Sequence, residues 1–191
     1  MPMPIRSLVR TWAALALTSS AIAGCAMPAG GGGSGGGASS ATDSGGLVGN
    51  PAPDFQVKAV TGGKGTVSLA QLRGQVVVVD FWGTFCGPCK KSFPKFEALS
   101  EKYGGSGLRV IGISEDESED KDKIPSFATT YGAKFTLAWD SDKTIAQKYK
   151  PETMPSTFII DRKGVVRYAH VGFHDGEERT VEKEIQELLG P

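Results

Sequence analysis

Two cysteines, Cys86 and Cys89, lie two residues apart in the segment FWGTFCGPCKKSFP, with Gly87 and Pro88 between them. Such a pair suits three kinds of chemistry: metal binding, a structural cross-link, or reversible thiol–disulfide exchange. A zinc ion takes about four ligands, and the chain adds only two histidines, His170 and His174, which are poorly spaced for that role. A disulfide over so short a loop constrains the unfolded chain little. The pair therefore favours redox exchange, and we expect no metal at this site.

The position of the pair in the sequence supports this chemistry. The run VVVVDF at 76–81 predicts a strand buried on both faces, and a helix is expected to begin near Cys86. A thiol at a helix N-terminus faces unpaired N–H groups and the positive end of the helix dipole, which favours the reactive thiolate. Cys89 is expected one turn further on, directed toward the core. Pro88 fits the first turn, where its missing N–H has no partner in any case.

Alternating patterns along the chain predict one α/β domain with a mixed sheet and helices on both faces. Gly104 and Gly105 end the helix that contains the cysteines, and Asp175 with Glu178 resembles the capped start of a last helix that stops at Gly190. The acidic run 115–122 is expected to be a solvated loop. The remaining predicted elements are strands at 108–114 and 135–139, helices at 124–132 and 142–150, and a hairpin of 156–161 with 165–171.

The N-terminal part of the chain has a different composition. Arg6 and Arg10 precede the apolar stretch TWAALALTSSAIA, and small residues lead into the third cysteine, Cys25. This pattern is typical of a signal peptide and resembles a bacterial lipobox, which implies lipidation of Cys25. We therefore expect a lipoprotein signal peptide at 1–24, a Gly/Ser-rich tether at 25–46 and the folded domain at 47–191, anchored to the membrane and facing an extracytoplasmic, oxidising compartment.

The bulk composition sets further limits. The 191 residues, 39% of them hydrophobic, are enough for one ordinary domain. Lys and Arg number 21, as do Asp and Glu, so the formal net charge is zero. A nucleic-acid-binding protein would show a basic excess, so no nucleic-acid partner is expected.

The segment VVVVDFWGTFCGPCKKSFP resembles thioredoxin. Together with GNPAPDFQVKAVTGGKGTVSLAQLRGQ, the insertion after the strand at 108–114, and MPSTFIIDRKGVV, it is similar to the membrane-tethered thioredoxin-like proteins of the ResA/TlpA group. The resemblance covers about 47–191. It implies a thioredoxin fold with an N-terminal extension, a thiol-disulfide oxidoreductase, and no cofactor beyond a redox-active Cys86–Cys89 disulfide.

The resemblance also implies a role for each matching residue. Cys86 corresponds to the cysteine that attacks the target, Cys89 to the one that resolves the mixed disulfide, and Asp80 to the buried carboxylate that takes the proton of Cys89. Pro155 corresponds to a cis-proline beside the cysteines, where the Met154 backbone would pair with an extended peptide. His170, by contrast, is expected to be a surface or packing residue and not a catalyst. The residues expected to contact substrate are Trp82, Gly87, Pro88, Met154 and Pro155.

Two departures from the family pattern bear on the substrate. Phe85 stands where tryptophan is usual, and Ser92 stands where the cytochrome-maturation members carry a glutamate. The Gly-Pro dipeptide resembles that of reducing members. We therefore expect a monomeric, broad-range protein-disulfide reductase, recharged by a membrane thiol-transfer protein, and place a dedicated apocytochrome c reductase second.

Two further functions stay open as alternatives. A peroxiredoxin-like peroxidase would need Pro-x-x-x-Thr-x-x-Cys, but Val79 stands in place of the proline, and Thr84 lies two residues before Cys86 instead of three. A copper chaperone of this fold would bind copper through Cys86, Cys89 and His170 or His174. That family usually spaces its cysteines three residues apart.

Overall fold

The structure is a computed structural model that describes residues 46–191. The predicted signal peptide, the tether and the lipidation site Cys25 all lie outside the described residues. Their assignment remains a prediction from the sequence.

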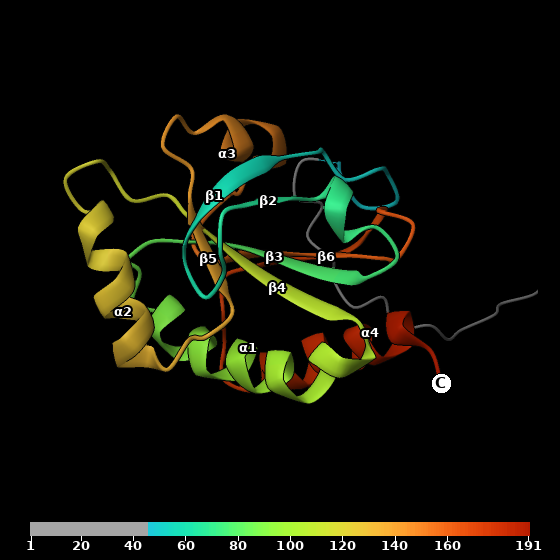
Figure 1. Cartoon of the computed structure of the whole chain (residues 1–191). Helices are drawn as coiled ribbons and strands as arrows, with labels where there is room; N and C mark the ends of the chain where they lie inside the picture. The colour runs from blue at the N-terminus through green and yellow to red at the C-terminus, as the bar shows by residue number, and fades with distance from the viewer. Residues whose placement is uncertain (1–45) are drawn as a thin grey trace, which may run out of the picture. The chain divides into compact units, whose positions relative to one another are not determined.

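A mixed sheet forms the centre of the domain (Figure 1). The strand predicted from VVVVDF is the central strand β3, and every one of its side chains is buried. It runs parallel to β4 and antiparallel to β6. In spatial order the strands are β2 (Thr66–Ser68), β1 (Gln56–Thr61), β5 (Thr136–Trp139), β4 (Leu108–Ser114), β3 (Val76–Trp82), β6 (Ser156–Ile160) and β7 (Val166–Val171).

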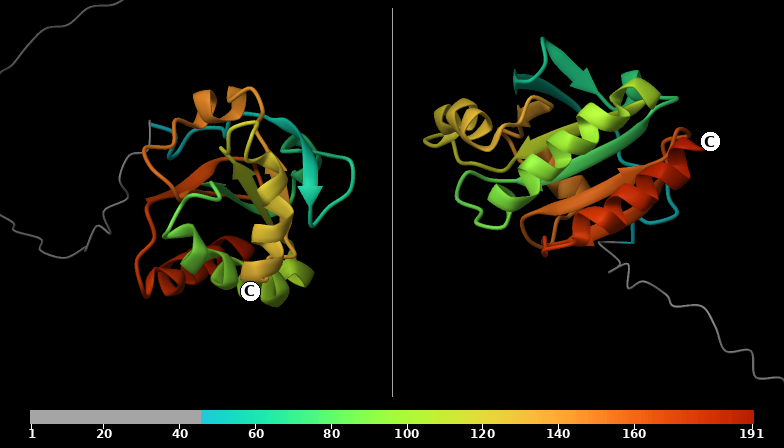
Figure 2. Two further views of the ribbon diagram at one scale, coloured as in Figure 1. Left: turned by 90° about the vertical axis from the view of Figure 1, so that its left-hand side faces the viewer. Right: turned by 90° about the horizontal axis from the view of Figure 1, so that it is seen from below.

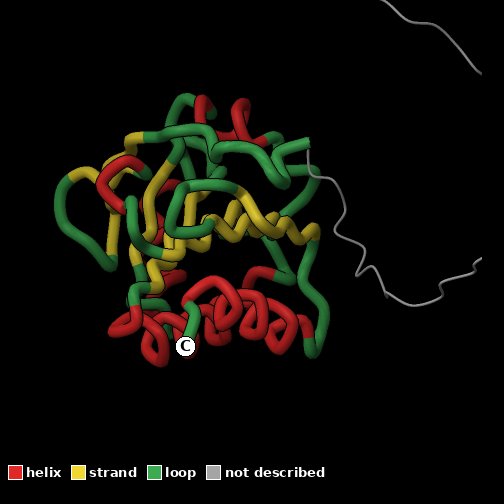
Figure 3. The backbone as a smooth tube through the Cα atoms, turned by 90° about the vertical axis from the view of Figure 1, so that its right-hand side faces the viewer, coloured by secondary structure: helices red, strands yellow, loops and turns green. Residues whose placement is uncertain are grey.

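Helices cover both faces of this sheet, as predicted. Helices α1 and α4 lie side by side on one face, and α3 lies on the other (Figures 1 and 2). Figure 3 shows the strands between these two helical sides. The helices are α1 (Cys89–Tyr103), α2 (Ile124–Tyr131), α3 (Thr144–Tyr149) and α4 (Glu177–Leu189), with short 3-10 turns at Ala70–Leu72, Gly104–Ser106 and Lys121–Lys123.

Side chains of β3 alternate between two apolar cores, because successive residues of a strand point to opposite faces. Val76, Val78 and Trp82 belong to the core under α1 and α4, which also contains both cysteines. The intervening valines and Phe81 belong to the core under α3. By the same alternation Asp80 lies on the face that carries the cysteines.

An N-terminal extension completes the sheet and fixes where the chain enters the domain. The β1–β2 hairpin, which the sequence did not reveal, adds two strands beside β5. Ahead of it, Pro51 forms a bridge with Val165, and the Gly49 N–H donates to the Val166 carbonyl at 2.8 Å. Val166 aligns through β6 with the first residues of β3. The chain therefore enters at the sheet end where β3 begins.

The predicted cap of the last helix was wrong. The N-cap position of α4 is occupied by Gly176, whose φ of 96° no ordinary side chain favours. Because of this turn, the carboxylate of Glu178 reaches back to the Gly176 N–H at 3.0 Å. Asp175 points outward instead and pairs with Lys91 of α1 at 3.3 Å. The helix does end at Gly190, as predicted.

Candidate active site

Cys86 and Cys89 form a disulfide in the loop that follows β3, with their Cα atoms 5.3 Å apart. Cys89 is fully buried, whereas Cys86 retains 5% of its surface. The helix α1 begins at Cys89, three residues later than predicted, because Pro88 occupies its N-cap position. The Cys86 sulfur still accepts the backbone N–H of Cys89 at 3.1 Å. The predicted contact between this sulfur and the helix N-terminus is therefore present.

A buried carboxylate holds the cysteine loop against the end of β4. Asp116 accepts the N–H and the hydroxyl of Thr84, at 3.0 and 2.6 Å, and the hydroxyl of Ser114 at 2.7 Å. The expectation of a solvated acidic loop was therefore wrong for its first two residues, since Glu115 and Asp116 are both buried. The sequence does contain a signal for Asp116. It closely follows a buried strand that runs parallel to β3, so it lies at the same end of the sheet as the cysteines.

Phe85 is the one large hydrophobic side chain that lies exposed within residues 46–191, at 65%. It directly precedes Cys86. Its ring folds over Gly83, where an added Cβ would come within 2.5 Å of it. The ring thus presents an apolar surface next in sequence to the less buried of the two cysteines.

Asp80 is buried in the middle of the sheet and has a single hydrogen-bond partner. Its Oδ1 accepts the hydroxyl of Thr157 on β6 at 2.7 Å, while Oδ2 has no partner within the described chain. Burial disfavours the charged form and raises the pKa of Asp80 to about 7, against the lowering effect of the Thr157 hydrogen bond. A carboxyl group with such a pKa can exchange a proton near neutral pH.

Trp82 ends β3 and lies between the sheet and two aromatic side chains. It is fully buried, with its ring centre 4.6 Å from that of Phe93 and 4.8 Å from that of Phe127. Its Nε1 has no hydrogen-bond partner among the described residues. The indole belongs to the same core as the cysteines. Its full burial leaves no surface for the substrate contact that was expected of Trp82.

The Met154–Pro155 peptide bond is cis, the form that the family resemblance implied for this position. Pro155 is buried and Met154 half-buried. The next residue, Ser156, pairs with Phe81 near the end of β3. Gly87 and Pro88 are exposed on the cysteine loop. Among the described residues, the predicted site residues thus gather around the end of β3: Asp80 and Trp82 are among its last three residues, and the others lie on the segments that follow it or lead into β6.

Ser92 is fully buried one turn into α1, and its hydroxyl donates to the Cys89 carbonyl at 3.2 Å. The hydroxyl is therefore satisfied by its own helix. It leaves no acidic group at the position where the cytochrome-maturation members have one.

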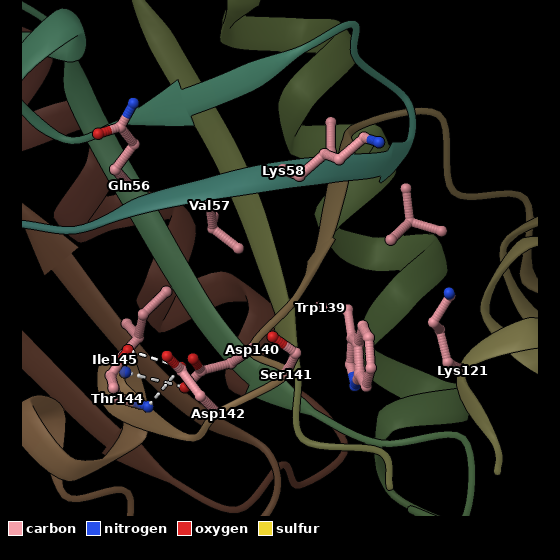
Figure 4. Close-up of a pocket in the computed structure, with 12 residues that line it drawn as sticks. Gln56, Val57, Lys58, Lys121, Trp139, Asp140, Ser141, Asp142, Thr144 and Ile145 are labelled. Carbon is pink, nitrogen blue, oxygen red and sulfur yellow. Dashed lines mark hydrogen bonds between the residues drawn. The ribbon is translucent and has the colours of Figure 1, made fainter. Parts of the chain in front are cut away.

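A cavity of about 550 Å³ lies elsewhere, between β1 and the segment from Trp139 to the start of α3 (Figure 4). In it Asp140 accepts the N–H groups of Ile145 and Ala146, each at 2.9 Å. Its carboxylate thus caps α3. None of the predicted site residues lines this cavity.

The fold and its disulfide define the class: this is a thioredoxin-like thiol-disulfide oxidoreductase. Comparison with known proteins then identifies the family. Residues 48–169 match the AhpC/TSA family, and the chain belongs to that family.

Individual relatives agree with this placement. The chain is 36% identical to the thioredoxin-like protein YneN of Bacillus subtilis over 65% of this chain and 71% of that one. It is 34% identical to the thiol-disulfide oxidoreductase ResA of Bacillus thuringiensis over 69% and 73%. A Chlorobium tepidum structure assigned as the thiol:disulfide interchange protein DsbE is 35% identical, with a TM-score of 0.68 over 73% of this chain and 96% of that one.

Within residues 46–191 no helix has both the length and the apolar character needed to cross a membrane.

Proposed function

We propose that this protein reduces disulfide bonds of other proteins outside the cytoplasm through the Cys86–Cys89 dithiol. The observation that carries the proposal is the unequal burial of the two cysteines: Cys86 retains 5% of its surface and Cys89 retains none. An incoming disulfide can therefore meet Cys86 alone, which assigns attack to Cys86 and resolution to Cys89.

In the first step the Cys86 thiolate attacks one sulfur of the target disulfide. A bond forms between Cys86 and that sulfur, the target S–S bond breaks, and the second target sulfur leaves as a thiolate that takes a proton from water. In the disulfide the Cys89 N–H donates to the Cys86 sulfur, and the same hydrogen bond would stabilise the Cys86 thiolate before attack.

In the second step Cys89 loses its proton to the Asp80 carboxylate and attacks Cys86. The mixed disulfide breaks, the Cys86–Cys89 disulfide forms, and the remaining target sulfur leaves as a thiolate. Two electrons pass from the dithiol to the target. Asp80 suits proton acceptance because its pKa lies near neutrality, and it afterwards returns the proton to the departing thiolate or to water.

The surroundings of the disulfide support binding of an extended peptide. Phe85 supplies an exposed apolar ring on one side of Cys86, and the cis Met154–Pro155 segment lies at the same sheet edge. A peptide that pairs with the Met154 backbone would place its disulfide at Cys86. We further propose that lipidated Cys25 anchors the domain and that a membrane thiol-transfer protein restores the dithiol.

Insulin reduction by the purified full chain tests the proposal. Wild type should reduce insulin, and both Cys86→Ala and Cys89→Ala should lose turnover. The matched pair then separates the roles: Cys89→Ala should accumulate mixed disulfides with insulin, because nothing resolves them, whereas Cys86→Ala should accumulate none. Mixed disulfides formed by Cys86→Ala, or turnover that survives both substitutions, would show that the assignment is wrong.

A further inference from the structure

The carboxyl group of Asp80 has an asymmetric environment that follows from the register of the sheet. Its neighbour on β6 is Thr157 and its neighbour on β4 is Gly112. Gly112 offers no side chain, and a Cβ there would lie 2.6 Å from Leu137 and 3.0 Å from the Trp82 indole nitrogen. The space on the β4 side is thus already filled. Thr157 supplies the one hydrogen bond that the carboxyl group receives within the described residues.

This arrangement makes the two carboxyl oxygens unequal. Oδ1 accepts the Thr157 hydroxyl, and Oδ2 accepts nothing. An oxygen that accepts a hydrogen bond is less basic, so the proton that Asp80 takes up is favoured on Oδ2. Thr157, the second residue of β6, is itself 98% buried, and its β-branched side chain has few accessible rotamers. The hydroxyl therefore keeps a fixed direction.

The strand β7, which lies next to β6, offers the Thr157 hydroxyl no competing hydrogen-bond partner. His170 on β7 lies opposite Thr157, but its ring nitrogens face Glu184 at 2.6 Å and Glu177 at 3.4 Å, both on α4. The buried titratable groups that α1 and α4 contribute on this face of the sheet are Cys89, held in the disulfide, Glu97 and Glu184. Glu97 accepts the N–H groups of Lys134 and Phe135, Glu184 pairs with His170, and within the described chain none of them makes a hydrogen bond to Thr157 or Asp80. The Thr157 hydroxyl serves Asp80 alone.

We propose that Thr157 is a positioning residue for the disulfide exchange, one that orients Asp80 and directs proton uptake to Oδ2. This inference rests on the proposed role of Asp80 as the acceptor of the Cys89 proton. The proton leaves the Cys89 sulfur, adds to Oδ2, and later returns by the same oxygen, while Oδ1 keeps its hydrogen bond to Thr157 throughout. No group other than those two side chains changes its protonation in this step.

Thr157→Val in the full chain tests the inference, because valine keeps the shape of threonine and lacks the hydroxyl. Two readouts are used. The first is infrared titration of the Asp80 carboxyl band, identified by its absence in Asp80→Asn. The second is the pH profile of insulin reduction. Loss of a hydrogen bond to a charged carboxylate should move the Asp80 midpoint up by about one to two pH units. Thr157→Ser keeps the hydroxyl and should restore the wild-type midpoint.

Controls separate this effect from a general loss of structure. Thr129→Val removes a hydroxyl on α2 that donates to Pro125, and should leave the Asp80 midpoint in place. In an Asp80→Asn background, Thr157→Val should not slow the reaction further. If the valine variant does not fold, Thr157→Ala gives the same titration. An unmoved midpoint in the variant that folds, or a further slowing in the Asp80→Asn background, would overturn the inference.

The two proposals fail separately in this design. If wild type reduces insulin and Asp80→Asn slows it, but the Thr157 variants titrate like wild type, the reductase function stands and the role of Thr157 is wrong. If wild type does not reduce insulin, the reductase function is wrong. The infrared midpoint still decides whether Thr157 controls the protonation of Asp80.

Discussion

The buried carboxyl group of Asp80 makes the stability of the oxidised domain depend on pH, and Asp80→Asn should remove that dependence. Burial raises the pKa of Asp80 from its ordinary value of 3.8 to about 7. Between these two values the folded protein holds a proton that the unfolded chain has lost. The contribution of Asp80 to the free energy of unfolding is therefore largest below pH 3.8. It falls as the pH rises and is lost above about pH 7.

The size of the effect follows from the pKa difference. It amounts to about three pH units, and each unit corresponds to about 1.4 kcal/mol, so the loss is about 4 kcal/mol between pH 4 and pH 8. Asparagine cannot titrate. The free energy of unfolding of Asp80→Asn minus that of wild type should therefore rise by about 4 kcal/mol over this range, whatever constant offset the amide introduces.

Urea unfolding of the oxidised full chain at several pH values, followed by tryptophan fluorescence, measures this difference. Glu115 also has a pKa raised to about 7, chiefly by its burial, but it is present in both proteins and cancels. Asp175→Asn is the control for the loss of a surface carboxylate, since the Asp175 side chain is 84% exposed. A flat difference between Asp80→Asn and wild type would refute the reasoning.

Three other predictions concern the neighbouring residues and the anchor. Asp116→Ala should lower the free energy of unfolding by about 1–3 kcal/mol, because it leaves the donors of half-buried Thr84 and buried Ser114 without their acceptor; urea unfolding measures this, and an unchanged value would contradict it. Phe85→Ala should slow insulin reduction but leave the unfolding midpoint within error, because the ring is exposed; an equal rate would show that the ring does not contact the target. Cys25→Ser should move the protein from the membrane to the soluble fraction of cells, and equal distribution of both forms would exclude lipid anchoring through Cys25.

The central strand could be predicted because its sequence leaves few alternatives. A run of four valines before Asp80 is too apolar for a surface strand and too short for a typical helix. The same run predicts that Asp80 is buried, since its neighbours on both sides are core residues. The hairpin of β6 and β7 could be predicted equally well, because its turn contains a glycine. Gly164 adopts the positive φ that this turn requires.

The contacts that the sequence did not reveal depend on register and backbone turns. Thr84 and Asp116 are 32 residues apart, and only the pairing of β3 with β4 brings them together. Thr157 faces Asp80 for the same reason, through β6. The prediction of the α4 cap was wrong because two neighbouring residues compete for the N-cap position. Asp175 has the spacing of a capping residue, but Gly176 has the backbone freedom to take the position instead.

The place where the chain enters the domain bears on how far the disulfide could lie from a lipid anchor. Residues 49–51 join the sheet beside Val165 and Val166, level with the start of β3, whereas the cysteines follow its other end. The seven residues of β3 put about 20 Å between these two levels. A tether predicted for 25–46 would span about 25 Å as a coil. With lipid on Cys25 and the tether in line with β3, the disulfide would lie about 45 Å from the bilayer. Soluble targets could then meet it directly, whereas the membrane thiol-transfer protein that we propose would have to extend a thiol that far or wait for the domain to turn over on its tether.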